Sequence, residues 1–290
     1  MRKKAISAKS DYTKSMLPQN RKAVFRDVMQ LHWQKLLLLG IILFLFYLPF
    51  LLVNMYYDSY TAGVFQAFPS MEQPQQEAAI HSVMQLDLIR GAISIPLLVL
   101  LSLPLSGILR TIRQYAWEEN VHIPTDFAKG IRDNFRQTAA LAALSGLIYT
   151  LCLSVYYTSD SYRSGPLSMI SLLPIAISLL LVLPIVAISL AMIPVYSNGI
   201  WKTLKNAFFV YTRSLLPSLG FLILCLLVWI PAMVPHPLFH IFGGIFAALA
   251  TPIALLAWSL FCYDRFDSHF NPLVCPELIG KGTFPFPKTE

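Results

Sequence analysis

The sequence predicts an all-α integral membrane protein with about six transmembrane helices, and three observations support this prediction. Of its 290 residues, 56% are hydrophobic and only 13% are charged, which gives a mean hydropathy of +0.59. A soluble domain carries roughly 25% charged residues, so too few charges remain here to cover a surface that faces water. The second observation is a set of six long apolar runs, and the third is a one-sided distribution of basic residues.

Each of the six apolar runs is long enough to cross a bilayer. A transmembrane helix needs about 20 apolar residues, because the hydrocarbon core is about 30 Å thick and each helical residue rises about 1.5 Å. No run contains Asp, Glu, Lys or Arg, and such long continuous runs do not match the short alternating strands of a β-barrel. The predicted spans are residues 36–57, 91–109, 138–158, 169–195, 215–234 and 238–261.

The basic residues predict the orientation of the chain. With the N-terminus in the cytoplasm, 20 of the 22 Lys and Arg residues lie in inner segments, and only Arg90 and Arg163 lie in outer ones. Segments rich in Lys and Arg stay on the cytoplasmic side, so we expect a multi-pass protein of the cytoplasmic membrane with both termini inside. The chain then divides into a basic N-terminal tail (1–24), a six-helix transmembrane domain (25–262) and a cytoplasmic C-terminal tail (263–290).

The basic N-terminal tail runs directly into the first apolar run. A basic segment in this position predicts contact with anionic lipid headgroups. Nucleic-acid binding is not expected, because no fold signature of a nucleic-acid-binding protein accompanies the charge. On the opposite side the only sizeable outer segment is 58–90, in which residues 76–88 are expected to form a short helix on the outer surface.

Three inner segments, each directly before an odd-numbered span, resemble one another. Each places two aromatic residues eight positions apart, with basic residues off the face that they share. This is the spacing of an amphipathic helix lying in the membrane interface. We therefore predict three repeats of an interfacial helix plus a helical hairpin; the alternative is coincidence, since 13% of the chain is aromatic. The predicted interfacial aromatics are Phe25, Trp33, Phe127, Phe135, Trp201 and Phe209.

Candidate catalytic and metal-binding chemistry is sparse in the spans. His240 is their only basic residue, and His236 lies four positions before it, on the same face of a helix. Zinc requires at least a third ligand, and no His, Cys, Asp or Glu adjoins this pair in the sequence. We interpret the two residues as an interfacial histidine pair, and we predict no catalytic residue, metal or cofactor.

The fourth run is the best candidate for lining a cavity. Its prolines recur at intervals of ten, and each removes a backbone hydrogen bond and can kink the helix. Kinks either open a cavity or shape the packing of neighbouring helices. The candidate lining residues are Ser171, Pro174, Ser178, Pro184 and Ser189.

The sixth run contains small residues at helical spacing, Gly243 and Gly244 followed by Ala247 and Ala248. Small residues at this spacing permit close helix contact in a membrane. The contact is expected either within the chain or with a partner subunit.

The inner segments also carry a family resemblance. Residues 123–137 have an acidic and aromatic start, Asp126-Phe127, followed by a basic, Asn-containing helix that enters a span. Together with Leu48-Pro49 and the segment 201–206, this pattern over residues 25–230 resembles the YesL-like family, bacterial polytopic membrane proteins of unknown function. The resemblance implies a protein of the cytoplasmic membrane, and genes of the family often lie beside carbohydrate uptake and degradation genes. The long outer segment and the C-terminal tail depart from the family pattern.

Two hypotheses for the function follow. The first is a non-enzymatic accessory or scaffold protein that binds another membrane subunit and is associated with a transport system, for carbohydrates if the family resemblance holds. The alternative is a transporter of small solutes or lipids that uses a proline-kinked cavity. A transporter needs a solvated cavity lined by polar groups, whereas a scaffold needs only a packed bundle and an exposed interface. An open polar cavity around the fourth run would therefore count against the scaffold.

Overall fold

The structure is a computed structural model, and it describes residues 17–160, 172–234 and 237–283. These residues form helices and short connections, with no strand among them. Six segments of the described chain are long and apolar enough to cross a membrane, as the six apolar runs predict. They are Arg21–Ser70, Gln73–Ala116, Ile123–Val155, Leu173–Met192, Leu215–Met233 and Leu238–His269.

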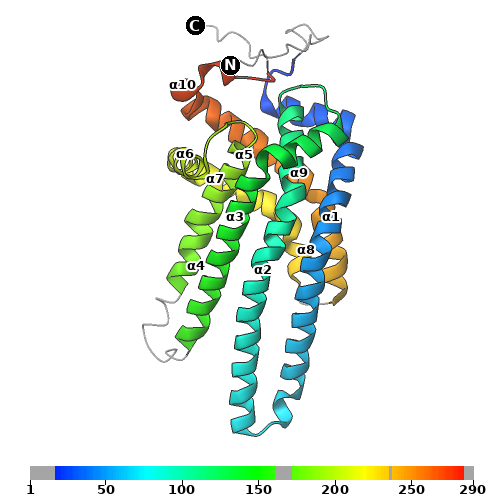
Figure 1. Cartoon of the computed structure of the whole chain (residues 1–290), viewed down its shortest axis with the longest axis vertical. Coiled ribbons are helices and arrows are strands. Elements are labelled where there is room, and N and C mark those ends of the chain that lie inside the picture. The colour runs from blue at the N-terminus through cyan, green and yellow to red at the C-terminus, as the bar shows by residue number, and fades with distance from the viewer. Residues whose placement is uncertain (1–16, 161–171, 235–236, 284–290) are drawn as a thin grey trace.

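The first two spans form a hairpin that is much longer than a bilayer is thick. Helix α1 (Arg21–Ala67) has 47 residues, and a short 3-10 turn, η2 (Phe68–Ser70), connects it to the 44 residues of α2 (Gln73–Ala116). At about 1.5 Å per residue α1 is about 70 Å long, more than twice the thickness of the hydrocarbon core. Figure 1 shows the α1–α2 turn projecting below every other part of the ribbon.

Residues 76–88 are helical, but they do not form a separate helix lying on the outer surface. They are the first part of α2, which continues without a break into the second span. No proline interrupts the helix between Pro74 and Pro96, and this outer part pairs with the end of α1. The prediction of a short surface helix was therefore wrong in its orientation.

Helix α3 (Ile123–Asp160) packs along α2 more extensively than any other pair of elements. Two glycines permit this approach: a Cβ added to Gly130 would lie 2.8 Å from the Cα of Gly107. A Cβ added to Gly107 would in turn meet the ring of Phe127 at 2.6 Å. The start of α3 therefore packs closely on α2, because Gly130 faces Gly107 and Gly107 faces the ring of Phe127.

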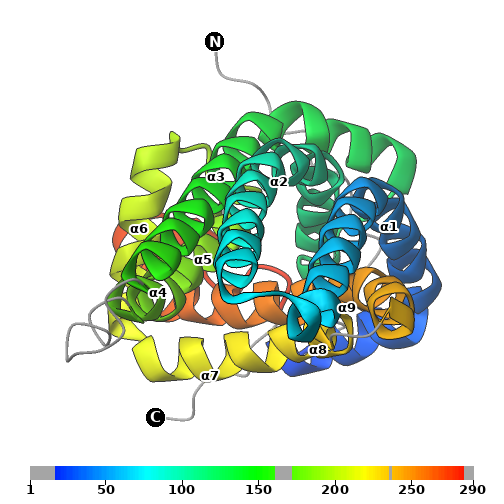
Figure 2. The same ribbon diagram turned by 90° about the horizontal axis from the view of Figure 1, so that it is seen from below.

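The remaining helices of the bundle are not all parallel to one another. Figure 1 shows α6 end-on and Figure 2 shows it from the side, so this helix lies across the long axis of the molecule. Helix α9 runs obliquely from the lower right to the upper left of Figure 1. The elements are α4 (Leu173–Ile177), the π-helical turn η4 (Ser178–Val182), α5 (Leu183–Met192), α6 (Ile200–Arg213), α7 (Leu215–Leu226), the 3-10 turn η5 (Leu227–Trp229), α8 (Ile230–Met233), α9 (Pro237–His269), α10 (Asn271–Val274) and the 3-10 turn η6 (Pro276–Leu278).

The small residues of the sixth span make contacts within the chain. A Cβ on Gly243 would lie 2.4 Å from the backbone carbon of Pro231 in α8, and Gly244 faces the ring of Tyr47 in α1. Ala247 and Ala248 are fully buried. The close contact that the sequence predicts is therefore an intramolecular one, which joins α9 to α8 and to α1.

The buried core lies mainly at the end of the bundle that carries both ends of the described chain (Figure 1). Its members come from the first part of α1, the last part of α2, α5, α6 and the last part of α9. The largest fully buried side chains there include Tyr211, Phe266, Met192, Leu39 and Ile112. Most basic residues of the described chain lie at this same end, so the positive-inside pattern predicts that this end faces the cytoplasm.

All three segments with the aromatic spacing are helical, but they are not alike. The first two are the opening parts of α1 and α3, each continuous with its span, whereas the third is the separate helix α6. On α6 the buried residues Thr203, Ala207, Val210 and Tyr211 face α5 and α9. The apolar face of α6 is thus used inside the bundle, and the organisation into three repeats stays a prediction.

The six aromatics of these segments do not form one kind of surface. Trp33 and Trp201 are exposed, Trp201 to 79%. Phe25 and Phe127 are half-buried against the core, and Phe209 is half-buried with the guanidinium of Arg213 over its ring, 5.0 Å from the ring centre. Phe135 is half-buried on α3. Only the two tryptophans therefore face outward as interfacial anchors would.

The connection after α2 contains a backbone conformation that predicts a stabilising substitution. Glu118 has a φ of +53°, the only positive φ at a non-glycine residue of the described chain. This left-handed conformation costs an L-residue about 1–2 kcal/mol, and glycine is the usual residue there after a helix. We expect Glu118→Gly to raise the midpoint of thermal unfolding by about 2 °C. Asn120→Gly is the control, and an equal effect of both substitutions would contradict the explanation.

Candidate functional site

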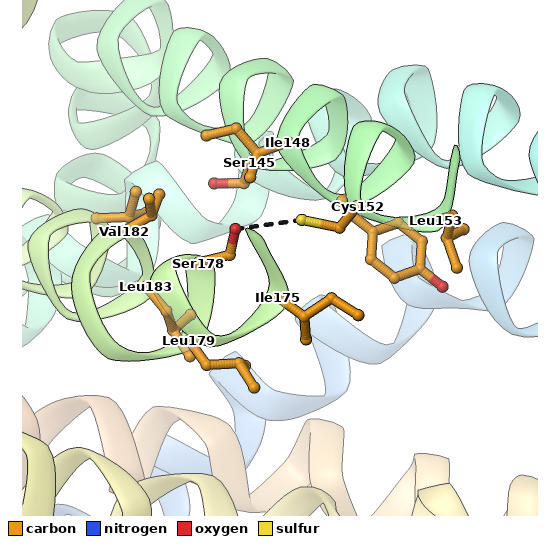
Figure 3. Close-up of a pocket in the computed structure, with 11 residues that line it drawn as sticks. Ser145, Ile148, Cys152, Leu153, Ile175, Ser178, Leu179, Val182 and Leu183 are labelled. Carbon is orange, nitrogen blue, oxygen red and sulfur yellow. Dashed lines mark hydrogen bonds between the residues drawn. The ribbon is translucent and has the colours of Figure 1, made fainter. Parts of the chain in front are cut away.

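A cavity of about 340 Å³ lies between α3 and the fourth span. Figure 3 shows α3 contributing one wall and the segment from α4 to α5 the other. Its lining consists almost entirely of apolar atoms, with a few polar atoms among them. The lining residues are Ser145, Ile148, Tyr149, Cys152, Leu153, Ile175, Ser178, Leu179, Val182, Leu183 and Val186.

A π-helical turn shapes the wall that the fourth span contributes. Pro184 has no backbone N–H, so the carbonyl of Leu180, four residues earlier, has no partner within a regular helix. The hydroxyl of Tyr211, on α6, donates a hydrogen bond to this carbonyl. At Ser178–Val182 the α-helix widens into a π-helical turn. Single turns of this kind interrupt the regular hydrogen-bond pattern of an α-helix. The proline, the wide turn and the tyrosine from another helix together form one structural unit beside the cavity.

Three polar side chains of the cavity lining, Ser145, Cys152 and Ser178, form hydrogen bonds within the protein. The Cys152 sulfur lies 3.2 Å from the hydroxyl oxygen of Ser178 (Figure 3) and 3.8 Å from the carbonyl oxygen of Pro174. The hydroxyl of Ser145 donates to the carbonyl of Leu141, one turn earlier, at 2.8 Å. An apolar occupant would leave these hydrogen bonds intact, whereas a strongly polar solute would gain few new ones.

The predicted cavity residues are distributed differently from the prediction. Ser178 lines the cavity, and Pro174 contributes a carbonyl oxygen at its edge. Pro184 and Ser189 are buried on the same span but do not line the cavity, and the Ser189 hydroxyl bonds its own helix at the carbonyl of Ile185. Ser171 lies outside the described residues.

Sequence reasoning missed the wall that α3 supplies. Its polar members, Ser145, Tyr149 and Cys152, are spaced by four and then three positions, which places them on one helical face. That spacing was a usable signal, because a row of polar groups along one face of an apolar span indicates the face turned toward other helices.

A prediction tests the unit formed by Pro184 and Tyr211. Tyr211→Phe keeps the ring but removes the hydroxyl that donates to the Leu180 carbonyl, and the loss of one such hydrogen bond costs about 0.5–1.5 kcal/mol. We expect a lower midpoint of thermal unfolding than that of the wild-type protein in the same detergent. Tyr149→Phe, which removes a hydroxyl from the cavity wall instead, is the control; equal midpoints for wild type and Tyr211→Phe would show that the bond contributes nothing.

A second cluster of polar groups joins distant segments at the end that carries the termini. The Arg21 guanidinium donates to Asp267 of α9 at 2.8 Å and to the carbonyl of Lys281 at 2.7 Å. The Lys281 ammonium lies 3.8 Å from the centre of the Trp117 ring and 3.4 Å from a Glu119 carboxylate oxygen. The chain up to residue 283 is therefore folded back onto the bundle.

Tyr196 and Asn271 extend this terminal cluster into the core. The Tyr196 hydroxyl donates to the side-chain oxygen of Asn271 at 2.5 Å, and Asn271 donates to Asp267 at 2.8 Å. Burial, reinforced by the charge of Asp267, raises the pKa of Tyr196, so this phenol stays a neutral donor. These contacts connect the segment after α5, the end of α9 and the start of α10.

The structure places an acidic side chain beside one of the two histidines. His240, at the start of α9, lies 3.4 Å from a carboxylate oxygen of Asp58 at the end of the first span. An acidic neighbour is therefore present, although 182 positions separate the two residues in the sequence. His236 lies outside the described residues. Within the described part of the chain no three His, Cys, Asp or Glu side chains are grouped as a metal site would require.

Comparison of the chain with models of protein families, with curated proteins and with solved structures gives no match in any of the three. The class of protein is therefore defined by the fold and the site alone. It is a helical protein with six segments able to cross a membrane and an apolar cavity in its wall. The resemblance to the YesL-like family stays a prediction.

Proposed function

We propose that this protein crosses the cytoplasmic membrane six times, with both termini inside, and acts there as a non-enzymatic accessory or scaffold protein for another membrane subunit. The observation that carries the proposal is the exposed apolar face of the fifth span and the start of the sixth. Only 11% of the most apolar stretch of the fifth span is buried in the chain, against 44% of the sixth. Large exposed side chains on this face are Leu216, Ile223, Leu224, Ile230, Met233, Phe239, Phe242 and Phe246.

The shape of the fifth span supports a protein partner on this face. The segment Leu215–Met233 has 19 residues and would measure about 28 Å as a straight helix. It is interrupted by η5, and α7 lies largely across the long axis in both Figure 1 and Figure 2. A short, interrupted and strongly inclined helix shields the hydrocarbon core poorly. A helix from a second subunit packed beside this span would cover its exposed apolar side chains.

The association with a transport system, for carbohydrates, is supported by the resemblance to the YesL-like family over residues 25–230. This association is part of the proposal because a scaffold protein needs a protein to bind, and genes of the family often lie beside carbohydrate uptake genes. The basic end of the bundle supports contact with anionic lipid headgroups on the cytoplasmic side.

The alternative function is a transporter, and the cavity favours lipids over small polar solutes within that alternative. A volume of about 340 Å³ with a mainly apolar lining suits a hydrocarbon chain. The Ser145 and Ser178 hydroxyls and the Cys152 thiol already form hydrogen bonds within the protein, so few polar groups of the lining could replace the water around a sugar or an ion.

The test is native mass spectrometry of the protein extracted gently from its own membrane. A second membrane protein bound in fixed ratio is expected, and it should be lost from the double variant Ile223→Ala, Phe242→Ala. The matched control is Leu45→Ala, Leu52→Ala, which truncates two exposed leucines on α1. Recovery of the protein alone with a bound lipid would overturn the scaffold, and loss of that lipid from Val182→Phe would establish the cavity as its site.

A further inference from the structure

The side of α6 that points away from the bundle carries basic and aromatic side chains that neither the cavity nor the exposed apolar face of the fifth span uses. Trp201 is 79% exposed and Phe208 is 47% exposed, and Lys202 and Lys205 are exposed beside them. Residues three or four positions apart are neighbours on a helix surface, so Lys205 lies next to Trp201, Lys202 and Phe208. We refer to these four side chains as the outer face of α6.

We infer that the outer face of α6 binds the headgroup of an anionic phospholipid, with the two lysines at its phosphate and the two aromatic rings at the boundary between headgroups and acyl chains. The charges support this ligand. Helix α6 contains no Asp or Glu. Within the described residues neither Lys202 nor Lys205 forms an ion pair, whereas the Lys281 ammonium lies 3.4 Å from Glu119. Two neighbouring positive charges without a counterion are complementary to a phosphate.

The helices that pack on α6 supply no competing carboxylate. Helices α5 and α7 contain no charged residue. Helix α9 contains two carboxylates, and both lie beside arginines: Asp267 is 2.8 Å from Arg21, and Asp264 is 3.8 Å from Arg265. Among the described elements that contact α6 most, none therefore offers its lysines a carboxylate without a cation, and an anion from outside the chain fits the two charges.

The position of α6 suits a headgroup. The helix connects the end of the fourth span to the start of the fifth, and it lies across the long axis at the periphery of the bundle in both Figure 1 and Figure 2. In a chain whose spans cross a bilayer, a connecting helix with this orientation lies along the membrane surface. The buried residues Thr203, Ala207 and Val210 fix its rotation, because they face the bundle and leave the outer face of α6 for lipid.

The aromatic and basic side chains of this face have the chemistry of that layer. Tryptophan is enriched where headgroups meet acyl chains. Lysine can place its aliphatic stem along apolar surface while its ammonium reaches the phosphate. The apolar face of α6 is already buried in the bundle, so the contact with lipid is made by charge and by two rings rather than by an apolar stripe.

This inference rests on the proposed insertion in the membrane, and it assigns the proposed contact with anionic headgroups to one helix. It does not depend on the scaffold role, because a second subunit would be lost from Ile223→Ala, Phe242→Ala, whereas the headgroup would be lost from variants of α6. It also differs from the cavity, since a lipid held through α6 should remain bound to Val182→Phe.

The experiment is native mass spectrometry of the purified full-length protein in detergent, with added phosphatidylglycerol or phosphatidylcholine of identical acyl chains. We expect the wild type to bind phosphatidylglycerol more tightly, and the double variant Lys202→Gln, Lys205→Gln to bind it about tenfold more weakly. Trp201→Ala should weaken binding of both lipids and keep the preference for phosphatidylglycerol.

The matched control is Lys22→Gln, Arg26→Gln, which also removes two exposed positive charges. Arg26 lies ten residues before Leu36 on the continuous helix α1, about 15 Å from the first apolar run. This control should bind phosphatidylglycerol as the wild type does. Equal binding by the wild type and the lysine variant of α6, or an equal loss in the control, would overturn the inference.

A second measurement on the wild type keeps the test decisive if the lysine variant fails to fold. Hydrogen exchange is compared in nanodiscs of phosphatidylcholine with and without phosphatidylglycerol. Residues 200–213 are expected to exchange more slowly with the anionic lipid, and residues 21–33 to be unchanged. High salt should remove the difference, because it screens the attraction between exposed charges. Identical exchange of α6 in the two membranes would contradict the site.

Discussion

Replacing Gly243 with alanine is expected to destabilise the protein by about 3 kcal/mol, because overpacking a close helix contact cannot be relieved by rotating a side chain. The added Cβ would lie 2.4 Å from the carbonyl carbon of Pro231 and 2.5 Å from the backbone nitrogen of Ala232. Both are backbone atoms, so α8 and α9 must move apart. The movement would also disturb the neighbouring contact of Gly244 with Tyr47 of α1.

The control for this prediction is Gly220→Ala on α7, where a Cβ meets nothing within 4 Å. Alanine in place of an exposed helical glycine is expected to stabilise by about 0.5–1 kcal/mol. The two variants should therefore shift the midpoint of thermal unfolding in opposite directions when measured in the same detergent. A Gly243→Ala protein that unfolds at or above the wild-type temperature would show that α8 and α9 are not in close contact.

The sequence predicted that small residues in the sixth span make a close contact, but it did not identify the partner. Spacing by four positions shows which side chains share a face, whereas the identity of the opposing helix depends on the whole bundle. The structure uses the glycines for α8 and α1. The exposed face of the same helix, with Phe239, Phe242 and Phe246, is left for lipid or another protein.

Six candidate spans were predictable because a continuous apolar run is a strong and local signal. The lengths of α1 and α2 were not, since both helices continue past the apolar runs through polar residues that carry no such signal. Their outer parts are helical without being apolar, and they are supported by the hairpin partner. A search for apolar segments therefore finds the membrane-crossing part of a helix and misses the rest.

One wall of the cavity, the fourth span, could be predicted from the sequence, whereas the wall from α3 was not predicted. Prolines in the fourth span indicated an irregular helix, and the irregularity exists as a π-helical turn at Ser178–Val182. Its form depends on Tyr211, which reaches the Leu180 carbonyl from another helix. Likewise, nothing in the local sequence connects His240 with Asp58. Contacts between residues far apart in the chain are set by packing, and a single sequence does not reveal them.

Arg21→Gln is expected to lower the free energy of unfolding by about 2 kcal/mol, because it leaves a shielded carboxylate without its cation. The side chains of Arg21 and Asp267 are only 11% and 19% exposed, and their atoms approach to 2.8 Å. The same guanidinium holds the Lys281 carbonyl at 2.7 Å. Loss of Arg21 should therefore also release the C-terminal segment, which Asp267→Asn alone should leave attached through Lys281.

Two measurements separate these effects. Thermal unfolding of Arg21→Gln, Asp267→Asn and the double variant gives the coupling between the two side chains, and we expect the double variant to be little worse than either single one. Hydrogen exchange of residues 271–283 reports the release of the segment, and it should increase in Arg21→Gln more than in Asp267→Asn. Arg26→Gln, exposed on the same helix, is the control. Additive losses, or equal exchange in both single variants, would show that Arg21 does not join the start of α1 to the segment 271–283.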